Sequence, residues 1–306
     1  MTRDDSTTFT FEHDGLRLAG RLWGARAASA ADDALLPIVC LPGLTRNSRD
    51  FAAFAYAVRQ RDPERMIVAF DYRGRGLSQQ AGTAETYTVP AEAADTIAGL
   101  AHLGIARAVF VGTSRGALII HALAAMHPAC LAGAVLNDAG PRIETEGLRH
   151  IRDTVGVVES HADWDAAIAA VATANAASFP ALSHDDFARM ARAGFTEREG
   201  KIVGDYDRKL LDPLRIMDLD TALPELWDAF DLMQAIPLLV IRGENSSLFS
   251  RDTVAQMADR HQGMETIEVA GQGHAPFLET AGLPERILTF VKRAERRGGG
   301  AEAASS

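Results

Sequence analysis

Short apolar segments rich in β-branched residues alternate with longer helical patterns over the first 140 residues of this 306-residue chain. Strands are predicted at 36–41, 66–70, 108–112 and 131–136, with helices at 49–60, 91–103 and 117–126. Strands joined through helices pair in parallel by right-handed crossovers, and the helices then cover both faces of the sheet. The alternation therefore predicts an α/β fold built on a mostly parallel sheet.

The alternation stops in the middle of the chain and resumes near its end. Residues 141–233 show helical patterns without a convincing strand. The chain then gives a strand at 237–241, a helix from 250, a strand at 266–269 and a last helix ending near 293. We therefore predict a core of residues 1–140 and 234–294, a helical insertion at 141–233, and a disordered tail at 295–306, which has no large apolar side chain. An antiparallel hairpin is predicted at 9–23, around the turn at Asp14 and Gly15.

Composition and charge exclude several classes of protein. Hydrophobic residues make up 47% of the chain, which is typical of a globular protein, and the net charge of −10 argues against a nucleic-acid partner. The segment Met1–Ser6 lacks the apolar core of a signal peptide, and no apolar run reaches the roughly 18 residues that span a bilayer. Two cysteines are too few for a disulfide framework or a Cys-rich metal site. We expect a cytoplasmic protein that acts on a small molecule, without a membrane partner and with its oligomeric state left open.

The strongest local signal is the pattern G-x-S-x-G at Gly112–Gly116, directly after the predicted strand at 108–112 and before a predicted helix. Glycines on both sides let the backbone turn sharply, so that the Ser114 hydroxyl projects above the edge of the sheet. The backbone N–H of Arg115 then lies at the start of a helix, where it can stabilise an oxyanion. This context predicts a nucleophilic serine.

A nucleophilic serine needs a base, and His274 is the best candidate among nine histidines. It lies in the loop between the last strand and the last helix, which ends at the same edge of the sheet as Ser114. A second oxyanion donor is expected from the loop after the strand at 36–41, where Gly43 permits close approach and the Leu44 N–H is the candidate.

The sequence resembles the α/β-hydrolase family. The matching features are the loop Pro42–Leu44, the turn Asp71–Ser78, the motif around Ser114 and the pair Gly273-His274, and they occur in the family's order. The resemblance implies an eight-stranded sheet, a helical cap over the site and a serine-histidine-acid triad that works without a cofactor. It also implies that the arginines of the Asp71–Ser78 turn tie loops together.

The chain departs from the family pattern at the acid. In most members that it resembles, the acid is an Asp shortly after the strand at 237–241, but Ser246 and Ser247 occupy that spacing here. Three alternatives stay open. Asp138 follows the preceding strand, from which some members recruit their acid, and it is our first choice. Glu244 lies on the expected loop but earlier, and Ser247 could accept a hydrogen bond from the histidine as a neutral substitute.

These features predict a cofactor-independent serine hydrolase that cleaves an ester or a similar carbonyl substrate through an acyl-enzyme on Ser114. Arg46 borders the predicted pocket and is a candidate for binding an anionic group of the substrate, with a surface salt bridge as the alternative. Hydrolysis of a C–C bond would use the same residues. A non-catalytic binding protein is the third hypothesis, because the expected acid is missing from positions 246 and 247.

Overall fold

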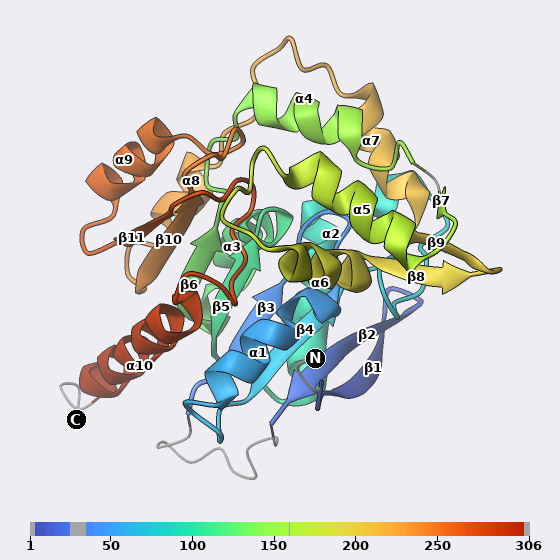
Figure 1. Ribbon diagram of the computed structural model, residues 1–306. Coiled ribbons are helices and arrows are strands. Elements are labelled where there is room, and N and C mark those ends of the chain that lie inside the picture. Colours follow the sequence, from blue (N-terminus) through green and yellow to red (C-terminus); the bar gives the residue numbers. More distant parts are fainter. Residues whose placement is uncertain (1–3, 25–34, 159, 303–306) are drawn as a thin grey trace.

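The computed structural model describes residues 4–24, 35–158 and 160–302 (Figure 1). Its central sheet has eight strands in the order β1-β2-β4-β3-β5-β6-β10-β11. These strands are β1 (Thr7–His13), β2 (Leu16–Trp23), β3 (Ile38–Leu41), β4 (Ile67–Asp71), β5 (Ala108–Thr113), β6 (Leu131–Asn137), β10 (Leu238–Gly243) and β11 (Glu265–Val269). The hairpin β1-β2 and the pair β2-β4 are antiparallel, and all other neighbours are parallel. The predicted α/β fold with a mostly parallel eight-stranded sheet is confirmed.

Apolar side chains alternate between the two faces of the sheet. In β3, Val39 and Leu41 belong to one core, while Ile38 and Cys40 belong to the other. This alternation buries both faces, as the period-two geometry of a strand requires. The helices α2 (Val89–Leu103), α3 (Arg115–Met126), α8 (Trp227–Asp231) and α9 (Arg251–Arg260) pack on the first face. The helices α1 (Ala52–Arg59) and α10 (Leu283–Glu302) cover the second (Figure 1).

Most of the segment between β6 and β10 lies above the carboxyl ends of the parallel strands (Figure 1), and we call residues 141–233 the cap segment. It contains the helices α4 (Thr145–Thr154), α5 (Trp164–Asn175), α6 (His184–Gly194) and α7 (Asp212–Ile216). It also contains a three-stranded antiparallel sheet of β7 (Ser160–His161), β9 (Lys201–Gly204) and β8 (Phe195–Arg198). Short 3₁₀ helices occur at η1 (Ser48–Phe51), η2 (Ala84–Thr86), η3 (Pro128–Cys130) and η4 (Arg208–Leu211).

The prediction of a cap segment without strands is wrong. A two-residue turn joins β8 to β9, and both of its residues, Glu199 and Gly200, have positive φ angles of 51° and 72°. Such a turn matches the twist of a hairpin. The flanking strands carry Glu, Arg and Lys rather than alternating apolar residues, which is why the periodicity gave no strand signal.

Two boundaries also differ from the prediction. Helix α8 falls inside 141–233, yet Phe230 is fully buried in the core beside α3, so this helix belongs to the layer that covers the sheet. Helix α10 continues to Glu302, so the expected disorder is wrong for residues 295–302, and 303–306 lie outside the described residues. Glu295 ties the start of this extension to the segments before β3 and β4, because it pairs with Arg65 and accepts the N–H of Leu36 at 2.9 Å. Among the described residues, no helix is long and apolar enough to cross a membrane.

Candidate active site

Ser114 lies in the tight turn between β5 and α3, with φ 54° and ψ −115°. The turn depends on two glycines. A Cβ atom on Gly112 would lie 2.5 Å from the backbone of Gly116, and a Cβ atom on Gly116 would lie 2.1 Å from the carbonyl oxygen of Leu41 in β3. Only glycine therefore lets α3 begin this close to the sheet, which places the serine at the carboxyl edge of the strands.

Three side chains distant in sequence form one continuous hydrogen-bonded chain. The Ser114 Oγ lies 2.7 Å from Nε2 of His274, and Nδ1 of the same ring lies 2.8 Å from Oδ2 of Asp138. The Asp138 side chain is 0% exposed and that of His274 is 16% exposed. Because a carboxylate accepts the Nδ1–H, the other ring nitrogen is left free to accept the serine proton.

Asp138 is fixed by the backbone of the neighbouring strand β10. Its N–H donates to the carbonyl oxygen of Ile241 at 2.8 Å, and its Oδ1 accepts the N–H of Gly243 at 2.8 Å. The residue has a positive φ of 60°, which turns the chain directly after β6. One carboxylate oxygen thus binds the strand and the other binds His274.

The two alternatives to Asp138, the carboxylate of Glu244 and the hydroxyl of Ser247, lie in other surroundings. Glu244 Oε2 accepts the N–H of Gly271 at 2.7 Å, which holds this carboxylate on the β11 side of the loop. Ser247 is exposed. The neighbouring Ser246 Oγ accepts the N–H groups of Leu248 and Phe249 at 3.3 and 3.2 Å, so it closes a local turn.

The loop after β3 approaches the serine closely. A Cβ atom on Gly43 would lie 3.8 Å from the Cβ of Ser114. In the next residue, the carbonyl oxygen of Leu44 accepts the Nε–H of Arg75 at 2.9 Å. Within the described part of the chain, no protein atom accepts the backbone N–H of Leu44 or of Arg115. Both amides are therefore available to a ligand beside Ser114.

Arg46 lines the cavity, but other residues hold its guanidinium. Its Nε donates to Asp50 at 2.8 Å, and its terminal nitrogen donates to the carbonyl of Met190 on α6 at 2.9 Å. Burial alone would lower the pKa of Arg46, but the neighbouring Asp50 raises it, so that the pKa lies above its usual value. These partners favour a role in fixing α6 to the core. Binding of an anionic substrate group by Arg46 stays a prediction.

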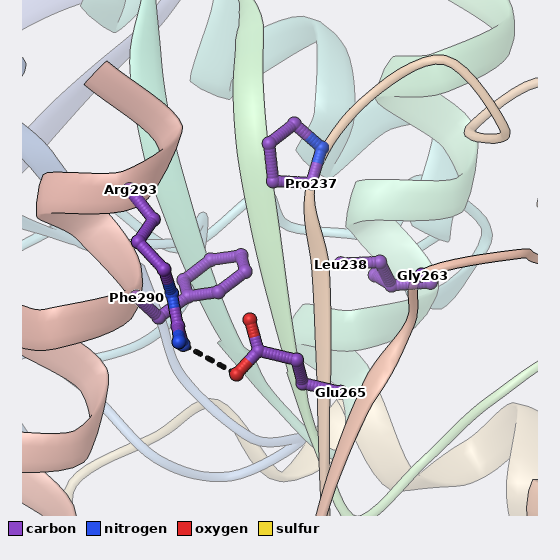
Figure 2. Close-up of a pocket in the computed structure, with 6 residues that line it drawn as sticks. All are labelled: Pro237, Leu238, Gly263, Glu265, Phe290 and Arg293. Atoms are coloured by element: carbon purple, nitrogen blue, oxygen red, sulfur yellow. Dashed lines mark hydrogen bonds and ion pairs between the residues drawn. The ribbon is translucent and has the colours of Figure 1, made fainter. Parts of the chain in front are cut away.

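A cavity of about 1830 Å³ lies between the core and the cap segment, and Ser114 and His274 line it. The cap side is formed by α4, α5, α6, β8 and β9. Glu279 also lines the cavity, and burial raises its pKa to about 7. A second hollow, of about 30 Å³, lies between α10 and the start of β10 and β11, where Arg293 pairs with Glu265 (Figure 2). That hollow lies at the amino ends of the parallel strands, whereas Ser114 lies at their carboxyl ends. Among the described residues, no group of three or more His, Cys, Asp or Glu side chains could hold a metal ion.

Comparison with known proteins agrees with this architecture. Residues 37–281 match the family model described as the alpha/beta hydrolase fold. The chain belongs to this family. It is thus a hydrolase of the α/β fold, as the motifs around Ser114 and His274 predicted.

Two relatives and one solved structure illustrate the similarity of this α/β hydrolase to known members. It is 30% identical over 278 residues to a 3-hydroxybutyrate-oligomer hydrolase of Cupriavidus necator, covering 87% of this chain and 89% of the relative. It is 29% identical over 235 residues to a 2-(acetamidomethylene)succinate hydrolase of Mesorhizobium japonicum, covering 76% and 79%. A crystal structure of an alpha/beta hydrolase from Novosphingobium aromaticivorans superposes with a TM-score of 0.84 and 34% identity, covering 95% of this chain and 99% of that one.

Sequence reasoning missed two acidic residues of this α/β hydrolase. Glu279 faces the cavity from the segment after His274, and Glu92 is buried on α2 between two arginines. Only the Arg73-Gly-Arg75 pattern indicated that such carboxylates exist, because arginines that become buried need carboxylate partners. The pattern could not tell which carboxylate the fold would supply.

Proposed function

We propose that this protein is a carboxylic-ester hydrolase that works through an acyl-enzyme on Ser114. The observation that carries the proposal is the continuous chain of hydrogen bonds from Ser114 through His274 to Asp138, at 2.7 and 2.8 Å. A hydroxyl is a poor nucleophile at its own pKa, and an adjacent oriented base is what activates it.

The reaction follows from this geometry. Nε2 of His274 takes the proton of Ser114 as the hydroxyl oxygen attacks the ester carbonyl, and the N–H groups of Leu44 and Arg115 stabilise the oxyanion. The imidazolium then gives its proton to the departing alkoxide, which leaves as an alcohol. The acyl group stays bound to Ser114 as the acyl-enzyme. Water, deprotonated by His274, attacks the acyl-enzyme, and the proton returns to Ser114 as the carboxylic acid departs. Asp138 accepts the Nδ1–H throughout and stabilises each imidazolium.

The substrate class that we propose is a short linear ester of a hydroxy acid. The relative in Cupriavidus necator is named for hydrolysis of 3-hydroxybutyrate oligomers, and such oligomers are chains joined by ester bonds. The cavity is larger than the roughly 300–1000 Å³ of common small-molecule sites. Small side chains widen it on the cap side, namely Ala170, Ala174 and Ala188.

Ser114→Ala tests the proposal directly, with Ser247→Ala as the matched control at an exposed serine of the same edge. The native protein and the control should be labelled by a fluorophosphonate and should hydrolyse p-nitrophenyl butyrate and 3-hydroxybutyrate trimer, whereas Ser114→Ala should do neither. Equal labelling of the native protein and Ser114→Ala, or hydrolysis that survives the loss of Ser114, contradicts the mechanism. Turnover of p-nitrophenyl butyrate without turnover of the trimer contradicts only the substrate class.

The two alternative functions have less support. The binding-protein hypothesis rested on the missing acid at 246 and 247, but Asp138 contacts His274 instead. C–C bond hydrolysis would use the same side chains, and no contact in the cavity favours it over ester cleavage.

A further inference from the structure

Building on the proposed function, we propose that Glu92 and Arg75 are positioning residues that hold the two oxyanion-binding amides at a fixed separation. Neither side chain touches the substrate in this proposal. They act through Leu44 and Arg115, the residues whose N–H groups serve as oxyanion donors in the proposed mechanism.

The inference rests on one buried carboxylate that pairs with two arginines. Glu92, on the first turns of α2, is 0% exposed. Its Oε2 accepts the Nε–H of Arg115 at 2.6 Å, and its Oε1 lies 2.8 Å from a terminal nitrogen of Arg75. Burial alone would raise the pKa of Glu92, but the two guanidinium groups lower it below its usual value, so the carboxylate is ionised at neutral pH.

Each arginine in turn fixes one residue of the oxyanion site. Arg75 donates its Nε–H to the carbonyl oxygen of Leu44 at 2.9 Å, which anchors the loop after β3. Arg115 is the residue after the nucleophile, and its side chain also donates to the carbonyl of Tyr87 at 3.0 Å. The two amides lie on different elements, β3's loop and the start of α3, and Glu92 connects them through these side chains.

Stability alone is a poor reason for this arrangement. Burying a carboxylate and two guanidinium groups has a large desolvation penalty, and well-packed apolar side chains are often equally stable in such places. An oxyanion site, in contrast, gains directly from fixed donors, because amides that need no reorganisation stabilise the transition state most. The contacts therefore fit a positioning role better than a purely structural one.

The same helix provides a matched control. Asp95 lies three residues after Glu92 on α2, is also buried, and binds Arg73 through two hydrogen bonds of 2.8 Å. Its other partner is His13 of β1, so this pair ties α2 to the N-terminal hairpin. It has no contact with Leu44 or Arg115 among the described residues.

The experiment compares Glu92→Gln with Asp95→Asn in the full-length protein. Glu92→Gln should lower kcat for p-nitrophenyl butyrate by about 10- to 100-fold, less than the 10²- to 10³-fold effect of removing one donor outright, with KM changed less than about threefold. The affinity for a trifluoromethyl ketone, whose serine adduct carries an oxyanion, should fall by the same factor as kcat. Asp95→Asn should lower the melting temperature about as much as Glu92→Gln does. It should nevertheless keep kcat and the ketone affinity within about threefold of the native values.

Arg75→Lys is the second variant, in case Glu92→Gln does not fold. It keeps a cation beside Glu92 but removes the Nε–H donated to Leu44, and it should show the same loss in kcat and ketone affinity. A folded Glu92→Gln or Arg75→Lys protein with native kcat overturns the inference, and so does an equal loss in Asp95→Asn. If Ser114→Ala still hydrolyses esters, the proposed function itself fails. If activity depends on Ser114 but Glu92→Gln has native kcat, only the inference about Glu92 and Arg75 fails.

Discussion

Replacing Asp138 with Asn changes one carboxylate oxygen into an NH2 group and leaves the side chain almost the same size. The structure dictates how the amide must turn. The N–H of Gly243 needs an acceptor and lies 2.8 Å from Oδ1, so the amide oxygen takes that position and the NH2 faces Nδ1 of His274. Two donors cannot face each other, so the imidazole must carry its proton on Nε2 instead.

That tautomer cannot accept the proton of Ser114. The same change of acid to amide in a serine protease triad lowers kcat by about 10⁴-fold through the wrong tautomer, and here we expect a similar loss. At about 1.36 kcal/mol for each factor of ten, this corresponds to roughly 5.4 kcal/mol in the activation barrier. The fold should be unaffected, because the bond to Gly243 is kept.

Stopped-flow or steady-state hydrolysis of p-nitrophenyl butyrate measures the loss, and the thermal unfolding midpoint checks the fold. Glu244→Gln is the matched control, because its carboxylate binds Gly271 and not the imidazole. It should keep activity within about threefold, as expected for a group outside the catalytic hydrogen bonds. If Asp138→Asn keeps more than a tenth of native kcat, the assignment of Asp138 as the acid is refuted.

Three further perturbations test other parts of the structure. Gly116→Ala places a methyl group 2.1 Å from the Leu41 carbonyl oxygen, so it should lower the free energy of unfolding in urea by about 3 kcal/mol, the upper end for overpacking. A native midpoint would contradict that contact. Burial raises the pKa of Glu279 from 4.5 to about 7, so between these pH values the folded protein binds a proton that the unfolded chain has lost. The free energy of unfolding therefore falls as the pH rises through this window. Glu279→Gln should therefore gain stability over the native protein between pH 4.5 and 8, by at most about 3 kcal/mol in denaturant titrations, and a constant difference refutes the assignment. Arg49→Met removes the hydrogen bonds to the carbonyls of Ala193 and Phe195 at the end of α6. The amides of α6 should therefore exchange hydrogen faster in the variant than in the native protein, while the amides of α5 keep their native rates.

The geometry around Ser114 was largely readable from the sequence because it depends on local backbone rules. The glycines around Ser114 force a sharp turn between a buried strand and a helix, and this context is visible in five residues. His274 follows from topology, since loops after parallel strands share one edge of the sheet. Asp138 was the first of three alternatives, because a sequence pattern does not show which way a side chain turns after its strand.

Features that depend on long-range contacts were not readable. Glu92 looks like an ordinary acidic residue in the first turn of a helix, and its partners lie 17 and 23 positions away in sequence. Arg46 borders the cavity as expected, but its partners Asp50 and Met190 come from the next helical turn and from the cap segment. The strands β8 and β9 are short and charged, so tertiary pairing and not apolar periodicity defines them.

The position of Asp138 illustrates how a parallel sheet can tolerate a change in the loop after β10. Strands β6 and β10 are neighbours, with Asn137 paired to Ile241, so the residues that follow them emerge side by side at about 4.8 Å. A carboxylate directly after β6 is therefore one strand spacing from β10, the strand after which the family resemblance puts the acid. The positive φ of Asp138 and the N–H of Gly243 turn it across that spacing toward His274. Ser246 and Ser247 are then free to form an ordinary turn, because β10 holds Asp138 through backbone groups and no side chain of the loop after β10 is needed for this.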